Sequence, residues 1–151
     1  MTRAYAILIA LLVPFWSAPA AAAVHSQADL ESALTRLLAK PAGPYTYVIM
    51  DNPTSKKYVQ FVVEDGHILI DLPLVQMSEA EQQKASAFFL KYGIKAPEEI
   101  DAPLTNGKTQ HLQTYQPLLR SPQAAAKMAF RIFAEVFGLT GEFDSQITES
   151  D

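Results

Sequence analysis

The sequence predicts an α+β domain with an antiparallel β-meander, in the order α-β-β-β-α-β-(β)-α. Two observations predict this class. Strand-like segments cluster between helical segments and do not alternate with them one by one. At the centre, two runs of alternating apolar residues are joined by Asp65-Gly66 and closed by Pro73, which is typical of a tight β-hairpin.

The hairpin Tyr58–Pro73 has two unequal faces. One face carries only apolar side chains and must be buried; its members are Val59, Phe61, Val63, Ile68, Ile70 and Leu72. The other face mixes apolar and polar side chains: Tyr58, Gln60, Val62, Glu64, His67, Leu69 and Asp71. We expect any function that the sequence encodes to lie on this mixed face.

Three amphipathic segments are expected to be helices, each with a serine as its N-cap. The first runs from Gln27 to Ala39 after Ser26. The second begins at Ser78, forms a capping box with Glu81 and extends to about residue 92. The third is opened by Ser121-Pro122 and ended by Gly138. Because the first and last have the broadest apolar stripes, we place them on the face that holds Phe61 and Ile70.

Four further segments complete the predicted sheet. Tyr45–Asp51 is apolar on both faces and is expected to be an interior strand. Ile94–Leu104 is interpreted as a short strand or an extended arm. Thr109–Leu119 is polar and broken by Pro117, which favours an edge strand. Phe143–Ile147 is a candidate final strand, and residues 148–151 are expected to fray.

The N-terminus has the three-part layout of a secretory signal peptide over residues 1–23. Arg3 is followed by an apolar stretch and then by small residues, with cleavage expected after Ala23. The alternative is a membrane anchor, but Pro14 interrupts an apolar core shorter than the ~20 residues that a span needs. We therefore expect a single domain over residues 24–151, periplasmic or secreted by a bacterium, with no stable membrane anchor after cleavage.

Composition excludes several classes of function. The chain has 151 residues, which suits one domain, and no cysteine, so disulfides, thiolate metal ligands and thiol catalysis are excluded. Arg3 is the only charged residue before Val24, which leaves eleven basic against sixteen acidic residues and a net charge of −5. Without a basic cluster, nucleic acid is not an expected partner.

No residue pattern indicates catalysis, a cofactor or a metal. His67 and Asp71 share one strand face but are roughly 13 Å apart along it, so we interpret both as exposed polar residues. None of the histidines has metal-ligand spacing to another ligand. Glu98, Glu99 and Asp101 are interpreted as a solvated acidic loop.

The mixed sheet face is the one candidate for partner binding. Its predicted members are Tyr47, Ile49, Tyr58, Gln60, Val62 and Leu69. A soluble exported protein rarely leaves such an apolar strip bare. Three things would cover it: an extended client peptide, a second copy in a homodimer, or the chain's own Phe88–Tyr92 segment.

Several of these motifs together resemble the type III secretion chaperone-like superfamily, and in particular its YbjN-type branch, which is described as sensory-transduction regulators or peptide-binding chaperones. The resemblance covers about residues 28–147. It is carried by Tyr58-Val59-Gln60-Phe61, Gly66, Ile70-Asp71-Leu72-Pro73, the Ser78 and Glu81 cap, Tyr92-Gly93, Ala125-Ala126 and Ile132 to Gly138. It implies an α/β chaperone-like fold, frequent dimers and binding of extended protein segments.

The sequence therefore favours an exported, non-enzymatic, chaperone-like protein that binds protein segments through a sheet face or a dimer groove. Two alternatives stay open: a small exported hydrolase of unrecognised type, and a structural component of envelope assembly. A cleft in which two or more perturbed acids or histidines converge would favour the enzyme, and an open apolar groove would favour binding.

Overall fold

The computed structural model describes residues 23–41, 43, 46–103 and 106–150. Within them one antiparallel sheet of seven strands packs with three α-helices, so the predicted α+β class is confirmed. The elements in chain order are α1 (Gln27–Ala39), β1 (Tyr47–Asn52), β2 (Lys57–Glu64), β3 (His67–Pro73), the 3-10 helix η2 (Leu74–Gln76), α2 (Glu79–Leu90), β4 (Glu98–Pro103), β5 (Thr109–Tyr115), β6 (Leu118–Leu119), α3 (Pro122–Glu135) and β7 (Gln146–Glu149).

The sheet has the order β4-β5-β3-β2-β1-β7, and the short β6 also pairs with β3. The predicted meander is therefore its centre, with Ile49 of β1 opposite Gln60 of β2 and Gln60 opposite Asp71 of β3. The central turn is made by Asp65 and Gly66 with φ angles of 50° and 74°. Positive φ at both residues is the geometry whose twist matches that of the flanking strands.

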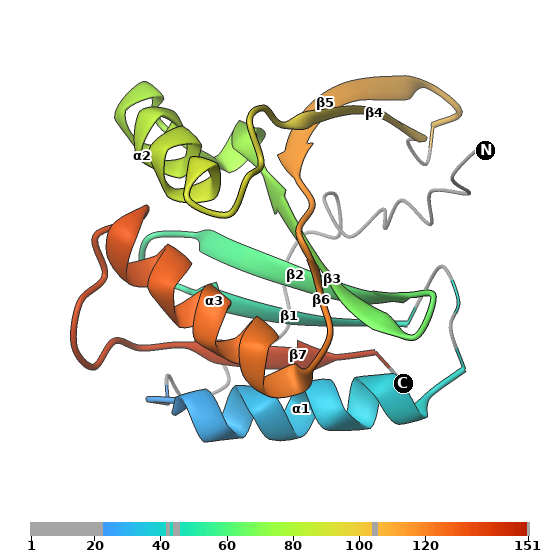
Figure 1. The fold of residues 1–151 in the computed structure, drawn as a ribbon, viewed down its shortest axis with the longest axis vertical. Coiled ribbons are helices and arrows are strands. Elements are labelled where there is room, and N and C mark those ends of the chain that lie inside the picture. The colour runs from blue at the N-terminus through green and yellow to red at the C-terminus, as the bar shows by residue number, and fades with distance from the viewer. Residues whose placement is uncertain (1–22, 42, 44–45, 104–105, 151) are drawn as a thin grey trace.

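All three described helices bury their apolar side chains on the same face of the sheet. Figure 1 shows α1 and α3 lying side by side along that face, with α2 above α3. One continuous core joins the helices to the strand face predicted to be buried; it includes Leu34, Val48, Phe61, Ile70, Phe89, Ile132 and Phe133. The placement of the first and last helices over Phe61 and Ile70 is confirmed.

The predicted helix starts are also confirmed. The side-chain oxygens of Ser26, Ser78 and Ser121 accept hydrogen bonds from backbone amides three residues on. These serines act as caps, which satisfy amides that the first helical turn leaves unpaired. The second helix ends at Leu90, slightly earlier than expected, and the chain then turns through Gly93 at a φ of 78°.

Two expectations are wrong. The segment after residue 109 is not an edge strand, because β5 pairs with β4 on one side and with the last two residues of β3 on the other. The C-terminal residues 148–150 do not fray, because β7 pairs with β1 and Ser150 closes the ladder. The Ser150 amide donates to the Tyr47 carbonyl at 3.0 Å, and its hydroxyl accepts from the Tyr47 amide at 2.9 Å.

Residues 1–22 of the predicted leader, which extends to Ala23, lie outside the described residues, as do Tyr45 and Asp151. Ala23 is described, and it forms an isolated antiparallel bridge with Ser145 just before β7. No helix within the described ranges is long and apolar enough to cross a bilayer.

Candidate functional site

The candidate site is the face of the sheet opposite the helices, called here the helix-free face. Alternation along the strands and the pairing register together define its members. They include Tyr47, Ile49, Asp51, Tyr58, Gln60, Val62, Glu64, His67, Leu69, Asp71, Thr114, Leu112, Ile100 and Ala102. None of them belongs to the core under the helices.

All six predicted binding residues lie together on this face. Tyr47 pairs with Val62, which pairs with Leu69, and Ile49 pairs with Gln60. Ile49 and Val62 are 3% and 7% exposed. The segment Phe88–Tyr92, one of the three expected covers of this face, does not lie over it, because Phe88 and Phe89 are part of the core on the other side of the sheet.

The face contains three buried polar atoms that lack a hydrogen-bond partner among the described residues. These atoms are Oδ1 of Asp51, the hydroxyl of Tyr58 and Nε2 of Gln60. Asp51 and Tyr58 are directly opposite each other across β1 and β2, and Gln60 is two residues further along the same face. Since each unsatisfied buried group costs about 1–3 kcal/mol, these three atoms have hydrogen-bonding capacity that no described residue uses.

Asp71 is not the exposed residue that the sequence predicted. It is 9% exposed, and its Oδ1 accepts hydrogen bonds from Thr114 Oγ1 at 2.6 Å and Gln116 Nε2 at 3.2 Å. Because β5 lies next to β3 in the sheet, Thr114 is close to Asp71 and helps to shield its carboxylate from solvent. Sequence reasoning missed this contact because the two residues are 43 positions apart.

Burial changes the acid–base chemistry of this face. It raises the pKa of Asp51 from 3.8 to about 6, and no described group lowers it again. Burial also raises the pKa of Asp71, against the hydrogen bonds from Thr114 and Gln116. The pKa of the Tyr58 phenol is raised by burial and, to a smaller extent, by the charge of Asp71.

The two carboxyl groups come from different parts of the face. Asp51 and Asp71 are two strands and two residues apart, which places their Cα atoms about 12 Å from each other. The arrangement is suited to hydrogen bonding and charge recognition.

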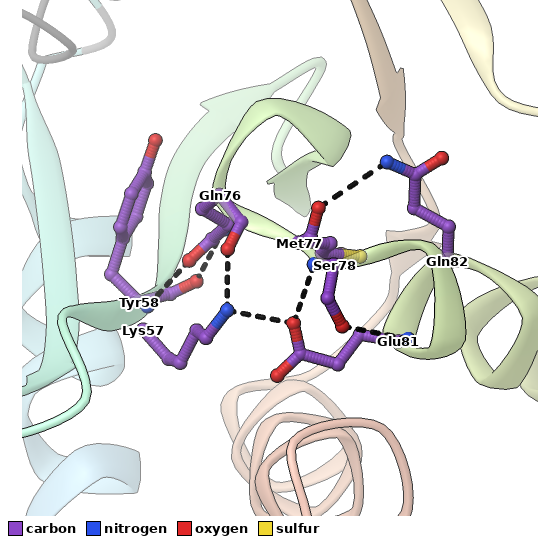
Figure 2. A network of polar contacts seen from close by, with 7 residues as sticks. All are labelled: Lys57, Tyr58, Gln76, Met77, Ser78, Glu81 and Gln82. Atoms are coloured by element: carbon purple, nitrogen blue, oxygen red, sulfur yellow. Dashed lines mark hydrogen bonds and ion pairs between the residues drawn. The ribbon is translucent and has the colours of Figure 1, made fainter.

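The start of β2 is held in place by the side chain of Gln76, as Figure 2 shows. Gln76 Oε1 accepts from the Tyr58 amide at 2.7 Å, and its Nε2 donates to the Tyr58 carbonyl at 2.9 Å. By register the residue opposite Tyr58 is Pro73, which has no N–H to donate. The Gln76 amide thus replaces the missing strand partner and fixes the backbone that carries the Tyr58 ring.

Lys57 links the start of β2 to the start of α2 (Figure 2). Its ammonium group donates to the Gln76 carbonyl at 2.5 Å and pairs with Glu81 Oε2 at 2.7 Å. Glu81 also accepts from the Ser78 amide at 2.7 Å, which completes the capping box. Although burial opposes it, these bonds from Lys57 and Ser78 lower the pKa of Glu81.

A second, smaller apolar cluster extends the helix-free face onto the β4–β5 hairpin. Ile100, Ala102 and Leu112 form it, and they are separate from the main core. The acidic residues near them lie on β4, not on a loop as predicted. The outer side of the hairpin carries Asp101, whose Oδ1 is 2.6 Å from Nδ1 of the exposed His111.

The other candidates for a site are weaker. A surface pocket of about 450 Å³ lies where α1 and α3 begin, and it shares no residue with the helix-free face. It is lined by Gln27, Ser121, Gln123, Ala124 and Lys127, of which only the lysine is ionisable. Among the described residues, no group of three His, Asp or Glu side chains is placed to hold a metal ion.

Asp51, Thr114 and the cluster on β4 and β5 were not predicted from the sequence. Alternation was a usable signal for Asp51, because it continues the series of Tyr47 and Ile49. The other residues had no such signal, since their place depends on the pairing of β5 with β3.

Comparison with known proteins adds no family to this picture. No family description, no curated protein and no solved structure matches the chain.

Proposed function

We propose that this chain is an exported, non-enzymatic, chaperone-like protein that binds extended protein segments on its helix-free face. The observation that carries the proposal is the combination of apolar side chains with unpartnered Asp51, Tyr58 and Gln60 on one strand face. An extended segment supplies apolar side chains at every second residue and N–H and C=O groups between them. It can therefore satisfy both kinds of group at once.

The finer fold assignment belongs to this proposal. The order of helices and strands and the residues of the central hairpin support a type III secretion chaperone-like fold of the YbjN type. Within such a fold a sheet face or dimer groove is the place for a protein segment. Export after cleavage at Ala23 is proposed on the layout of residues 1–23.

A small exported hydrolase is the second candidate, and one observation favours it. Burial raises the pKa of both Asp51 and Asp71 on the same face. The hydrogen bonds that Asp71 accepts from Thr114 and Gln116 speak against a catalytic role for its carboxylate. We therefore favour binding over catalysis.

The test uses an unfolded client of known sequence. The full chain is expressed with its leader, purified from the periplasm and titrated against carboxymethylated α-lactalbumin, which is permanently unfolded, and against the native form. We expect the unfolded form to bind and the native form not to bind. Binding of neither form contradicts the proposal.

A matched pair of leucines locates the surface. Leu118 pairs with Leu69 on the helix-free face and is 46% exposed, whereas Leu90 is 60% exposed at the end of α2. Both tolerate a polar replacement because they are exposed. We expect Leu118→Asp to weaken client binding at least tenfold and Leu90→Asp to leave it unchanged. A dimer in light scattering that only Leu118→Asp dissociates would instead assign the face to a second copy.

A further inference from the structure

The helix-free face carries several carboxyl side chains and, among the described strand residues, no lysine or arginine; its one histidine, His67, is opposite Glu64 at the far end of the hairpin. Asp51, Glu64 and Asp71 lie on it. Across the described strands there is a single lysine and no arginine, and that lysine, Lys57, turns to the other side, where it pairs with Glu81. No described cation forms an ion pair with Asp51 or Asp71, so the charge of this face is left to a ligand.

A buried polar side chain within this acidic group also points to a ligand. Gln60 is 2% exposed, lies directly opposite Asp71, and its Nε2 has no partner among the described residues. Asp51 adds an unpartnered acceptor on the neighbouring strand. The face thus offers one buried donor that needs a carbonyl oxygen and one buried acceptor that needs an N–H.

We infer that the protein segments bound on the helix-free face carry a lysine or arginine next to apolar residues, with the cation placed on Asp51 and a main-chain carbonyl on Gln60. This inference rests on the proposed function and names its ligand class. A buried carboxylate is stable only when a cation or several hydrogen bonds compensate it. A ligand ammonium or guanidinium group supplies that compensation, and valine or leucine side chains fill the strip around Ile49 and Val62.

The experiment compares two peptides that differ only in charge. Val-Ser-Lys-Ser-Val-Ser-Lys-Ser-Val places valines and lysines on one side of an extended chain. The second peptide has glutamine in place of both lysines. Each is labelled with fluorescein, and its affinity for the periplasmic protein is measured by anisotropy at pH 7.5. We expect the lysine peptide to bind about tenfold more tightly, as one charge-assisted hydrogen bond in a partly buried site gives.

Two substitutions that remove the same charge identify the carboxylate. Asp51→Asn keeps the shape of the side chain, and we expect it to reduce the preference for lysine to less than twofold. Asp101→Asn acts on the opposite, outer side of β4, and we expect it to leave the preference unchanged. In the unmodified protein, raising the salt concentration is expected to weaken the lysine peptide only, which gives a readout independent of either variant.

The outcomes separate this inference from the proposed function. Equal affinity for the two peptides overturns the charge preference and leaves segment binding in place. A preference that Asp101→Asn removes as fully as Asp51→Asn overturns the assignment to Asp51, because it then reflects net charge alone. Binding of neither peptide, together with no binding of unfolded α-lactalbumin, overturns both proposals.

Discussion

At the scale of the residue, Asp51 is a half-buried carboxyl group whose Oδ1 atom is shielded from water. It continues the apolar series of β1 and faces the Tyr58 ring across the ladder. Burial raises its pKa from 3.8 to about 6, and Oδ1 has no described partner. A group of this kind opposes folding when it is charged. Its presence therefore calls for an explanation outside stability, and ligand recognition is the one we propose.

Asp51 gives a pH-dependent prediction. Because its folded pKa lies above the unfolded value, the folded state binds the proton more tightly between about pH 4 and 6. Its contribution to stability is thus fully present below pH 4 and is lost as the pH rises through 6. Asp51→Asn removes this loss, so the variant should gain free energy of unfolding relative to the wild type as the pH rises.

Urea unfolding at pH 4, 5, 6 and 7 checks this expectation. The difference between variant and wild type should increase up to about pH 6 and then level off. Asp65→Asn, which removes an exposed carboxyl group from the turn of the hairpin, serves as the control. A pH-independent difference for Asp51→Asn would mean that its carboxyl group is not shielded.

At the scale of the element, β3 ends at Pro73, and the side chain of Gln76 makes the hydrogen bonds to Tyr58 that the strand itself does not make. Pro73 cannot donate to Tyr58, so the strand ladder alone would leave the Tyr58 carbonyl without a partner. The turn of η2 brings the Gln76 amide to both backbone groups of Tyr58. Strand, 3-10 helix and α2 are thereby fixed as one corner of the fold.

Removing this amide should be costly. We expect Gln76→Ala to lower the free energy of unfolding by about 2–3 kcal/mol, because two backbone groups lose their partners. Gln76→Glu should also destabilise, because a carboxylate cannot donate to the Tyr58 carbonyl.

Gln82 provides the matched control, since its amide makes a single bond of 3.3 Å to the Met77 carbonyl. Gln82→Ala should cost well under 1 kcal/mol in the same urea titrations. If Gln76→Glu is as stable as the wild type, the donor role of Nε2 is wrong.

At the scale of the whole molecule, the buried apolar side chains form two separate clusters of different size. The main core joins three helices to one sheet face. The second consists of Ile100, Ala102 and Leu112 on the β4–β5 hairpin, on the helix-free side. Because a cluster of three side chains buries little area, we propose that it extends the candidate binding face and does not hold the fold together.

One pair of substitutions tests this division. Leu72 is fully buried in the main core, and Leu72→Ala should lower the free energy of unfolding by about 2–5 kcal/mol. Leu112→Ala removes the same atoms from the small cluster and should cost less than half as much. It should nevertheless weaken binding of unfolded α-lactalbumin. Equal losses of stability would place Leu112 in a folding role.

Local rules accounted for much of the fold. The capped helices, the Asp65-Gly66 turn and the buried face of the hairpin depend on neighbours within a few residues, and all are confirmed. The edge position of the segment after residue 109 was wrong because strand order depends on distant pairing. The fraying of residues 148–150 was wrong because β1 offers them an open edge.

The sequence by itself determined the α+β class, the hairpin and the six apolar and polar residues that share one strand face, because alternation along a strand is a local property. Only the tertiary structure decided that the helices all pack on the other face, that Thr114 donates to Asp71, and that one polar atom each of Asp51, Tyr58 and Gln60 is buried without a described partner. The physical reason is that burial and hydrogen bonding depend on which distant segments meet, and chain order does not specify those meetings.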